Sequence, residues 1–148
     1  MRMSDLKQFT VCLGELSYLL NLNLQGNLID DEMSTWLVSG LICNHTLRYL
    51  DLSNNRIADK GMVKVASYLM RSRSLICLDL TNNQIGARGG FAISLVIKES
   101  TMLKQIKLGM NRLDDMCGSK IVKALIKNEN LEELEMSSND LEINVIIY

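Results

Sequence analysis

Two pairs of adjacent aspartates, Asp30-Asp31 and Asp114-Asp115, are the side chains of this sequence best placed to do chemistry. Paired carboxylates can act as a general acid and base, or can bind a divalent cation. Each pair stands between a leucine-rich stretch and an amphipathic one, where a helix is expected to begin. Carboxylates at that position accept hydrogen bonds from free backbone N–H groups and favour the positive end of the helix dipole. We therefore interpret both pairs as helix caps.

Two short stretches begin like ligand-binding loops and do not continue as such. Residues 51–55 carry oxygen side chains at alternating positions, as a calcium loop does, but Arg56 stands where that loop needs glycine. Residues 86–90 are glycine-rich and precede a helical pattern, yet they lack the Gly-Lys-Ser/Thr ending of a nucleotide-binding loop. The sequence therefore predicts no metal site and no cofactor.

The remaining reactive side chains are scattered along the chain. The single histidine, His45, lies in a connection and has no nucleophile assigned to it. We interpret the widely spaced cysteines as reduced thiols, and two disulfides in a secreted protein are the alternative. These cysteines are Cys12, Cys43, Cys77 and Cys117. With no catalytic residue predicted, we expect the protein not to be an enzyme.

Composition excludes several classes of protein. The chain has 148 residues, 47% of them hydrophobic, and a net charge of -1, so it can form one core and lacks the basic excess of a nucleic-acid-binding protein. No apolar run approaches the roughly 20 residues of a membrane span, and the first residues lack the apolar segment of a secretory signal. We expect a cytoplasmic protein without membrane insertion or nucleic-acid partner.

The elements that would position these residues follow a period of 28 residues. The pattern L-x-x-L-x-L-x-x-N-x-[IL] fits 19–29, 47–57, 75–85, 103–113 and 131–141, with aliphatic substitutes at Ile106 and Met136. A short strand holds the second and third leucines on one face, and a bend turns the first one inward. The asparagine that follows can satisfy backbone groups outside the sheet. We expect a ladder of Asn27, Asn55, Asn83, Asn111 and Asn139.

The second half of each unit has helical periodicity. In the unit that begins at residue 47, Asp59 is the expected N-cap. The buried stripes are expected at Met62, Val65, Ala66 and Leu69, and in the unit from 103 at Ile121, Val122 and Leu125. One strand-loop-helix unit cannot bury its apolar side alone, so the copies must stack into an arc of parallel strands with helices outside.

These units resemble the ribonuclease-inhibitor type of leucine-rich repeat. That type has a glycine at the fifteenth position, matched by Gly61 and Gly89, and an alanine-like residue five positions later, matched by Ala66. Met33 and Cys117 depart from the glycine, which places the local geometry of helix entry in question. The resemblance implies an α/β solenoid of about five 28-residue repeats, with a parallel sheet on the concave face and helices on the convex face.

The whole chain, 1–148, is expected to form a single domain. Residues 1–18 are the helix half of a preceding unit, 19–46, 47–74, 75–102 and 103–130 are full repeats, and 131–148 form a partial terminal repeat. The fifth strand is expected to lack a polar terminal cap, which solenoids usually need for solubility. We expect a segment of a longer arc, or a chain held inside a larger assembly.

Two surfaces are candidates for partner binding. The concave candidates are Asn23, Tyr49, Asp51, Asp79, Gln105, Lys107, Glu133 and Glu135, whose mixed charges argue against a phosphate backbone as partner. A merely solvated sheet face is the alternative. The convex candidates are Trp36, Val63 and Phe91, at or next to the same outward helix position. An exposed aromatic patch often marks a contact surface, and burial against a neighbouring helix is the alternative.

The function predicted is a non-enzymatic protein–protein interaction scaffold, in a segment or subunit of a larger intracellular assembly. What the resemblance implies spans ribonuclease inhibitors, innate-immune sensors, Ran GTPase-activating proteins and leucine-rich subunits of the ciliary dynein regulatory complex. The uniform units look closest to the last group, which suggests the axoneme of the cilium as one setting. A GTPase-activating-protein-like regulator and an enzyme-inhibitor-like binder are the alternatives, and fold analogy alone supports any named partner.

Overall fold

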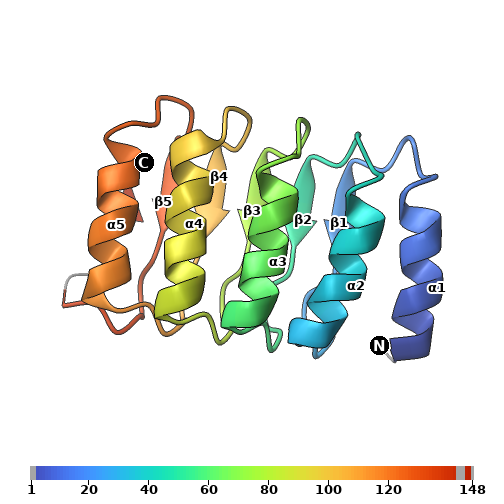
Figure 1. Cartoon of the computed structure of the whole chain (residues 1–148), viewed down its shortest axis with the longest axis horizontal. Helices are drawn as coiled ribbons and strands as arrows, with labels where there is room; N and C mark the ends of the chain where they lie inside the picture. The colour runs from blue at the N-terminus through green and yellow to red at the C-terminus, as the bar shows by residue number, and fades with distance from the viewer. Residues whose placement is uncertain (1–2, 143–145, 148) are drawn as a thin grey trace.

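A computed structural model of the chain describes residues 3–142 and 146–147 and places helices and strands in two layers. Figure 1 shows the helices side by side in chain order along one face of the sheet. The helices are α1 (Met3–Leu13), α2 (Asp31–Leu41), α3 (Asp59–Leu69), α4 (Ala87–Glu99) and α5 (Asp115–Leu125). The strands are β1 (Asn21–Asn23), β2 (Tyr49–Asp51), β3 (Cys77–Asp79), β4 (Gln105–Lys107), β5 (Glu133–Glu135) and β6 (Ile146–Ile147). The predicted α/β solenoid is confirmed.

The first five strands pair in parallel, and their order in the sheet is their order in the chain. The central residues of these strands are register partners, each 28 residues after the last: Leu22, Leu50, Leu78, Ile106 and Leu134. Leu50 and Leu78 are 2% and 1% exposed, so the aliphatic seam predicted from the repeat lies in the core between the two layers. Each coil thus completes the burial of its neighbour.

The outer side of β5 is paired as well. Strand β6 runs antiparallel to it, with Leu134 opposite Ile147 and Glu135 opposite Ile146. The repeat pattern predicts no polar terminal cap for the fifth strand, and it does not predict β6. Because the chain folds back, β5 has backbone partners on both sides instead of an open edge that could pair with other chains.

The helices face the core with the stripe that the repeat predicts, except in α5. Met62 and Val65 of α3 are 0% and 1% exposed, as expected. Val122 was predicted to be buried and is 41% exposed. The buried stripe of α5 runs through Cys117, Ile121 and Ala124 at spacings of four and three, which leaves Val122 about 100° round the helix from Ile121.

The asparagine after each of the strands β2 to β5 ties its coil to the one before, whereas Asn27, after β1, donates to the carbonyl of Gln25 in its own coil. The Oδ1 atom of Asn55 accepts the N–H groups of Asn27 and Ile29 at 3.0 and 2.9 Å. Its Nδ2 atom donates to the carbonyls of Leu24 and Leu52 at 3.0 and 2.9 Å. Asn83, Asn111 and Asn139 make the same kinds of contact. The predicted ladder therefore runs from side-chain amide to backbone, and not from amide to amide.

Candidate protein-interaction surfaces

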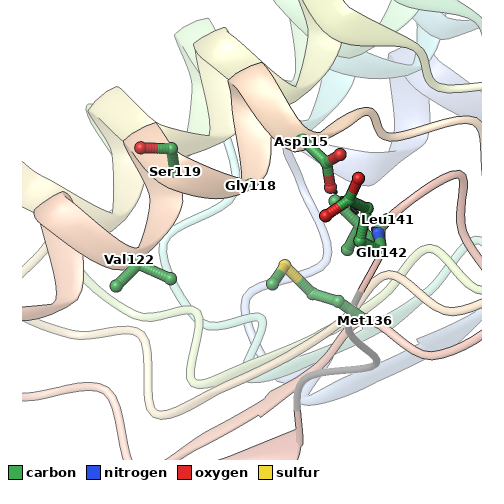
Figure 2. Close-up of a pocket in the computed structure, with 7 residues that line it drawn as sticks. All are labelled: Asp115, Gly118, Ser119, Val122, Met136, Leu141 and Glu142. Atoms are coloured by element: carbon green, nitrogen blue, oxygen red, sulfur yellow. Dashed lines mark hydrogen bonds between the residues drawn. The ribbon is translucent and has the colours of Figure 1, made fainter.

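The hollow beside α5 is lined by two carboxylates and a hydroxyl, those of Asp115, Glu142 and Ser119 (Figure 2). Its volume is about 150 Å³, and Asp115 Oδ1 accepts the backbone N–H of Glu142 at 2.9 Å. Figure 2 shows the Ser119 hydroxyl pointing away from both carboxylates, so the hollow holds no nucleophile paired with a base. Across 3–142 and 146–147, no three His, Cys, Asp or Glu side chains are grouped so that they could bind a metal ion.

The first aspartate of each pair caps its own helix, as predicted. Asp30 is the N-cap of α2, and its Oδ1 atom accepts the N–H of Met33 at 2.9 Å. Asp114 is the N-cap of α5 and accepts the N–H of Cys117 at 2.9 Å. Both carboxylates therefore satisfy a backbone donor that the helix leaves free.

The residue directly after the N-cap of α2 or α3 caps the helix of the next coil. Asp31 Oδ1 accepts the N–H groups of Ala58 and Gly61, at the start of α3, at 2.8 and 2.7 Å. Asp59 Oδ1 does the same for α4, accepting from Gly86 and Gly89 at 2.8 Å each. The prediction that Asp59 caps its own helix is wrong, because the N-cap of α3 is Ala58, which makes no side-chain capping bond.

The repeat glycine is where this carboxylate comes close to the next helix. A Cβ atom on Gly61 would lie 2.6 Å from Asp31 Oδ1, and one on Gly89 would lie 2.9 Å from Asp59 Oδ1. The equivalent position in the third coil is Ala87, which has no carboxylate to offer α5. Cys117 can therefore replace glycine there, and α5 uses its own cap.

A second asparagine joins the coils where each helix returns to a strand. Asn44 is 4% exposed, its Nδ2 atom donates to the carbonyls of Leu13 and Leu16 at 2.9 and 3.1 Å, and its Oδ1 atom accepts the N–H of Leu47 at 2.9 Å. Asn128 repeats these contacts in a later coil. This role was not predicted from the sequence, although the spacing of the two residues, three repeat lengths, is a signal for it. His45, next to Asn44, is exposed.

The predicted concave residues lie on β1 to β5, on the sheet face opposite the helices. Tyr49 is 48% exposed and lines a shallow depression of about 270 Å³ that also includes Asn23, Asp51 and Asp79. Asn21, a neighbour in the same depression, was not among the predicted site residues. Polar side chains surround one aromatic ring in this depression, and Leu22 and Leu50 also line it, so both hydrogen-bonding and apolar groups of another protein could contact it.

The other half of the concave face is a chain of hydrogen-bonded side chains. Cys77 Sγ donates to Gln105 Oε1 at 2.8 Å, and Gln105 Nε2 donates to Glu133 Oε2 at 2.5 Å. Glu135 accepts the backbone N–H groups of Gly109 and Ser137 at 3.0 and 2.8 Å. These contacts fix the side chains before any partner arrives. Lys107, the remaining predicted residue, lies between them on β4.

The predicted convex residues are all partly exposed. Trp36, Val63 and Phe91 are 39%, 38% and 45% exposed, on α2, α3 and α4. Trp36 lines a groove with α1, and Lys7 Nζ lies 4.4 Å from the centroid of its ring. Phe91 lines a groove with α5, and Lys120 Nζ lies 5.0 Å from its ring centroid. The two aromatic rings thus belong to different grooves.

The four cysteines differ in accessibility, which predicts the order of their alkylation. Cys12 and Cys43 are exposed, whereas Cys117 is 1% exposed and its burial raises the pKa of the thiol to about 11. At pH 8 only about one thiol in a thousand at Cys117 would be the reactive thiolate. Burial also raises the pKa of Cys77.

We expect iodoacetamide at pH 8 to modify Cys12 and Cys43 first, Cys77 more slowly, and Cys117 only after urea is added. Peptide mass spectrometry over time gives the order directly. Modification of Cys117 in the folded chain at the rate of Cys12 would contradict the burial of this thiol at the start of α5.

Comparisons with known proteins agree with the fold. A family profile for the leucine-rich repeat matches residues 43–66, 71–94 and 127–142. The tropomodulin C-terminal domain of Caenorhabditis elegans superposes with a TM-score of 0.76 at 16% identity, over 90% of this chain and 83% of that one. A structure of leiomodin-1 actin-binding site 2 gives 0.79 at 18% identity, over 92% and 79%. The sequence has no significant match among curated proteins.

Proposed function

We propose that this chain, a leucine-rich-repeat protein, is a non-enzymatic scaffold whose concave face binds a segment of another protein. The observation that carries the proposal is the rigid presentation of polar side chains on five strands in strict register. Gln105 and Glu135 are already held by hydrogen bonds, so binding would require little further ordering of the surface.

The size of the face limits what it can bind. Five strands at a spacing of about 4.8 Å span about 20 Å, which is enough room for one helix, about 10–12 Å across, or one extended segment with its side chains. Tyr49 would supply the main anchor, because partly exposed tyrosines are common centres of binding energy in protein interfaces. Asp51 and Asp79 beside it would pair with basic or hydrogen-bond-donating groups of the partner.

Actin is the first partner to test, because one similar structure is described as an actin-binding site of leiomodin-1. On the same ground we propose a cytoplasmic, cytoskeletal setting. The axoneme of the cilium, as part of a larger assembly, is proposed from the resemblance of the repeats alone. Regulation of a small GTPase and enzyme inhibition are the competing functions, and stimulated GTP hydrolysis would reveal the first of them.

We expect the chain to sediment with filamentous actin and Tyr49→Ala to weaken this binding at least about tenfold, the effect of losing a central aromatic anchor. Tyr49 is half exposed, so its removal should leave the urea midpoint nearly unchanged. Lys98→Ala, on the opposite side of the molecule, is the matched control and should bind as the unmodified chain does.

If actin does not bind, crosslinking and mass spectrometry on the native complex would identify the partner and the face it occupies. Crosslinks from the partner to residues beside β2 and β3 would support the proposal. A partner captured equally well by the Tyr49→Ala variant and crosslinked to the helices alone would contradict it.

A further inference from the structure

The net charge of -1 conceals a negative concave face and a positive region on the outer side of α3, α4 and α5. On the concave face, Asp51, Asp79, Glu133 and Glu135 stand against a single Lys107. On α3, α4 and α5, the exposed basic residues are Lys60, Lys64, Arg88, Lys98, Lys120 and Lys123. Their exposed acidic neighbours on these helices are Glu99 and Asp115. The fold thus separates charges that alternate along the sequence.

The positive charge on α3, α4 and α5 is largely uncompensated. Glu99 is already paired with Lys98 at 2.9 Å, and Asp115 accepts the backbone N–H of Glu142 at 2.9 Å. Of the six exposed basic residues, Lys98 alone forms an ion pair within the part of the chain that the structure describes. A surface with several unpaired charges of one sign attracts and orients a partner of the opposite sign.

An apolar groove lies within this positive field, between α4 and α5. Its volume is about 370 Å³, and Phe91, Met116, Arg88 and Lys120 line it; we call these four residues the basic groove. Phe91 and Met116 are 45% and 67% exposed. Lys120 lies over the Phe91 ring, so the charge and the apolar wall form one surface.

We propose that the basic groove docks an acidic segment of a partner protein. An aliphatic or aromatic side chain of the segment enters between Phe91 and Met116, and carboxylates on either side of it pair with Arg88 and Lys120. Arginine binds a carboxylate through two parallel hydrogen bonds, which fixes the orientation of the segment as well as its charge. Since the concave face carries the opposite sign, the scaffold joins two partners of different chemistry.

The geometry favours an acidic protein segment over the other anionic partners. The Phe91 ring lies in a groove between helices, under Lys120, and so is poorly placed to insert into a bilayer. The same lysine covers one face of that ring, on which a nucleic-acid base would have to stack. A side chain that enters the groove while acidic groups remain at its rim uses both features.

The test uses a fluorescein-labelled peptide of glutamate and aspartate residues with one central leucine, and a control peptide with alanine at the centre. Fluorescence anisotropy should show that the leucine peptide binds at least about fivefold more tightly, because the groove buries its side chain. R88E combined with K120E should weaken binding at least about tenfold, and Phe91→Ser should remove the preference for leucine.

The matched control is K64E combined with K98E, which changes the net charge equally outside the groove and should cost much less affinity. Urea midpoints check that every variant is folded, and Tyr49→Ala should bind the peptide as before, which separates this proposal from the concave site.

Equal loss of affinity in both charge-reversal variants would contradict a role for the basic groove. Binding to phosphatidylserine vesicles or single-stranded DNA without binding to the peptide would overturn the protein partner. Salt-sensitive self-association that K120E abolishes would also contradict a separate partner protein, because a second copy of this chain would then occupy the groove.

Discussion

Replacing Asn83 by alanine is expected to destabilise the fold by about 3 to 4 kcal/mol, because each buried backbone group left without a partner costs about 1 to 3 kcal/mol. Asn83 is 7% exposed and accepts the N–H of Ile57 at 3.0 Å. It donates to the carbonyls of Leu52 and Leu80 at 3.0 and 3.1 Å. Water cannot replace these bonds readily, because Ile57 and Leu80 are 0% exposed.

Urea unfolding followed by circular dichroism measures this loss, with Gln84→Ala as the matched control. Gln84 is the next residue and is exposed, so its truncation should change the stability by less than about 0.5 kcal/mol. A loss below about 1 kcal/mol for Asn83→Ala would show that the amide ladder does not join the coils as described.

Asp59→Ala is expected to cost about 2 kcal/mol, the upper part of the range for a lost N-cap. It removes the acceptor for two N–H groups, those of Gly86 and Gly89, and so loosens the junction between the second and third coils. A second substitution should compensate for the lost cap. Gly86→Asp would place a carboxylate at the N-cap of α4, where α5 already has Asp114.

The backbone at Gly86, with φ -105° and ψ -157°, is close to that of the capping residue Asp30, with φ -102° and ψ -170°. In the Asp59→Ala background we therefore expect Gly86→Asp to restore about 1 kcal/mol. In the unmodified chain it should give no gain, because two carboxylates would then compete for the same donors. Additive effects of the two substitutions in a double-mutant cycle would contradict a shared role.

The architecture was predictable because the repeat encodes it five times. A leucine spacing of three and then two suits neither a helix nor an ordinary strand, and its recurrence every 28 residues fixes the register of Leu50 against Leu78. The role of the asparagines also followed from their chemistry. Their actual partners, the backbone groups of the preceding coil, became clear only in three dimensions.

The origin of the helix caps could not be predicted by reading one helix at a time. A cap is usually sought within the same turn, and Asp59 was assigned to α3 for that reason. Its N–H partners are 27 and 30 residues away, on the next helix. The departures at Met33 and Cys117 were visible as exceptions. At Cys117 the reason, that Ala87 of the preceding coil has no carboxylate, became clear only once the coils were stacked.

Charge separation was hidden for a similar reason. The 16 basic and 17 acidic residues are interspersed along the sequence, so no run of one sign stands out. Only the stacking of α3, α4 and α5 along one face of the sheet (Figure 1) brings together the helices that carry Lys64, Arg88 and Lys120. Strand β6 was likewise missed, because two residues give too short a pattern to distinguish a strand from the start of a helix.

The glycines buried between helices set the bend of the arc. Strand spacing is fixed by backbone hydrogen bonds, but helix spacing depends on side-chain volume, and the ratio of the two determines the radius of curvature. A Cβ atom on Gly90 would lie 2.6 Å from Cys117 Sγ, and one on Gly40 would lie 2.5 Å from the Thr10 carbonyl oxygen. Larger residues there would push the helices apart and tighten the bend. The width of the concave opening is thus governed by residues between the helices, which a partner bound on the concave face could not touch.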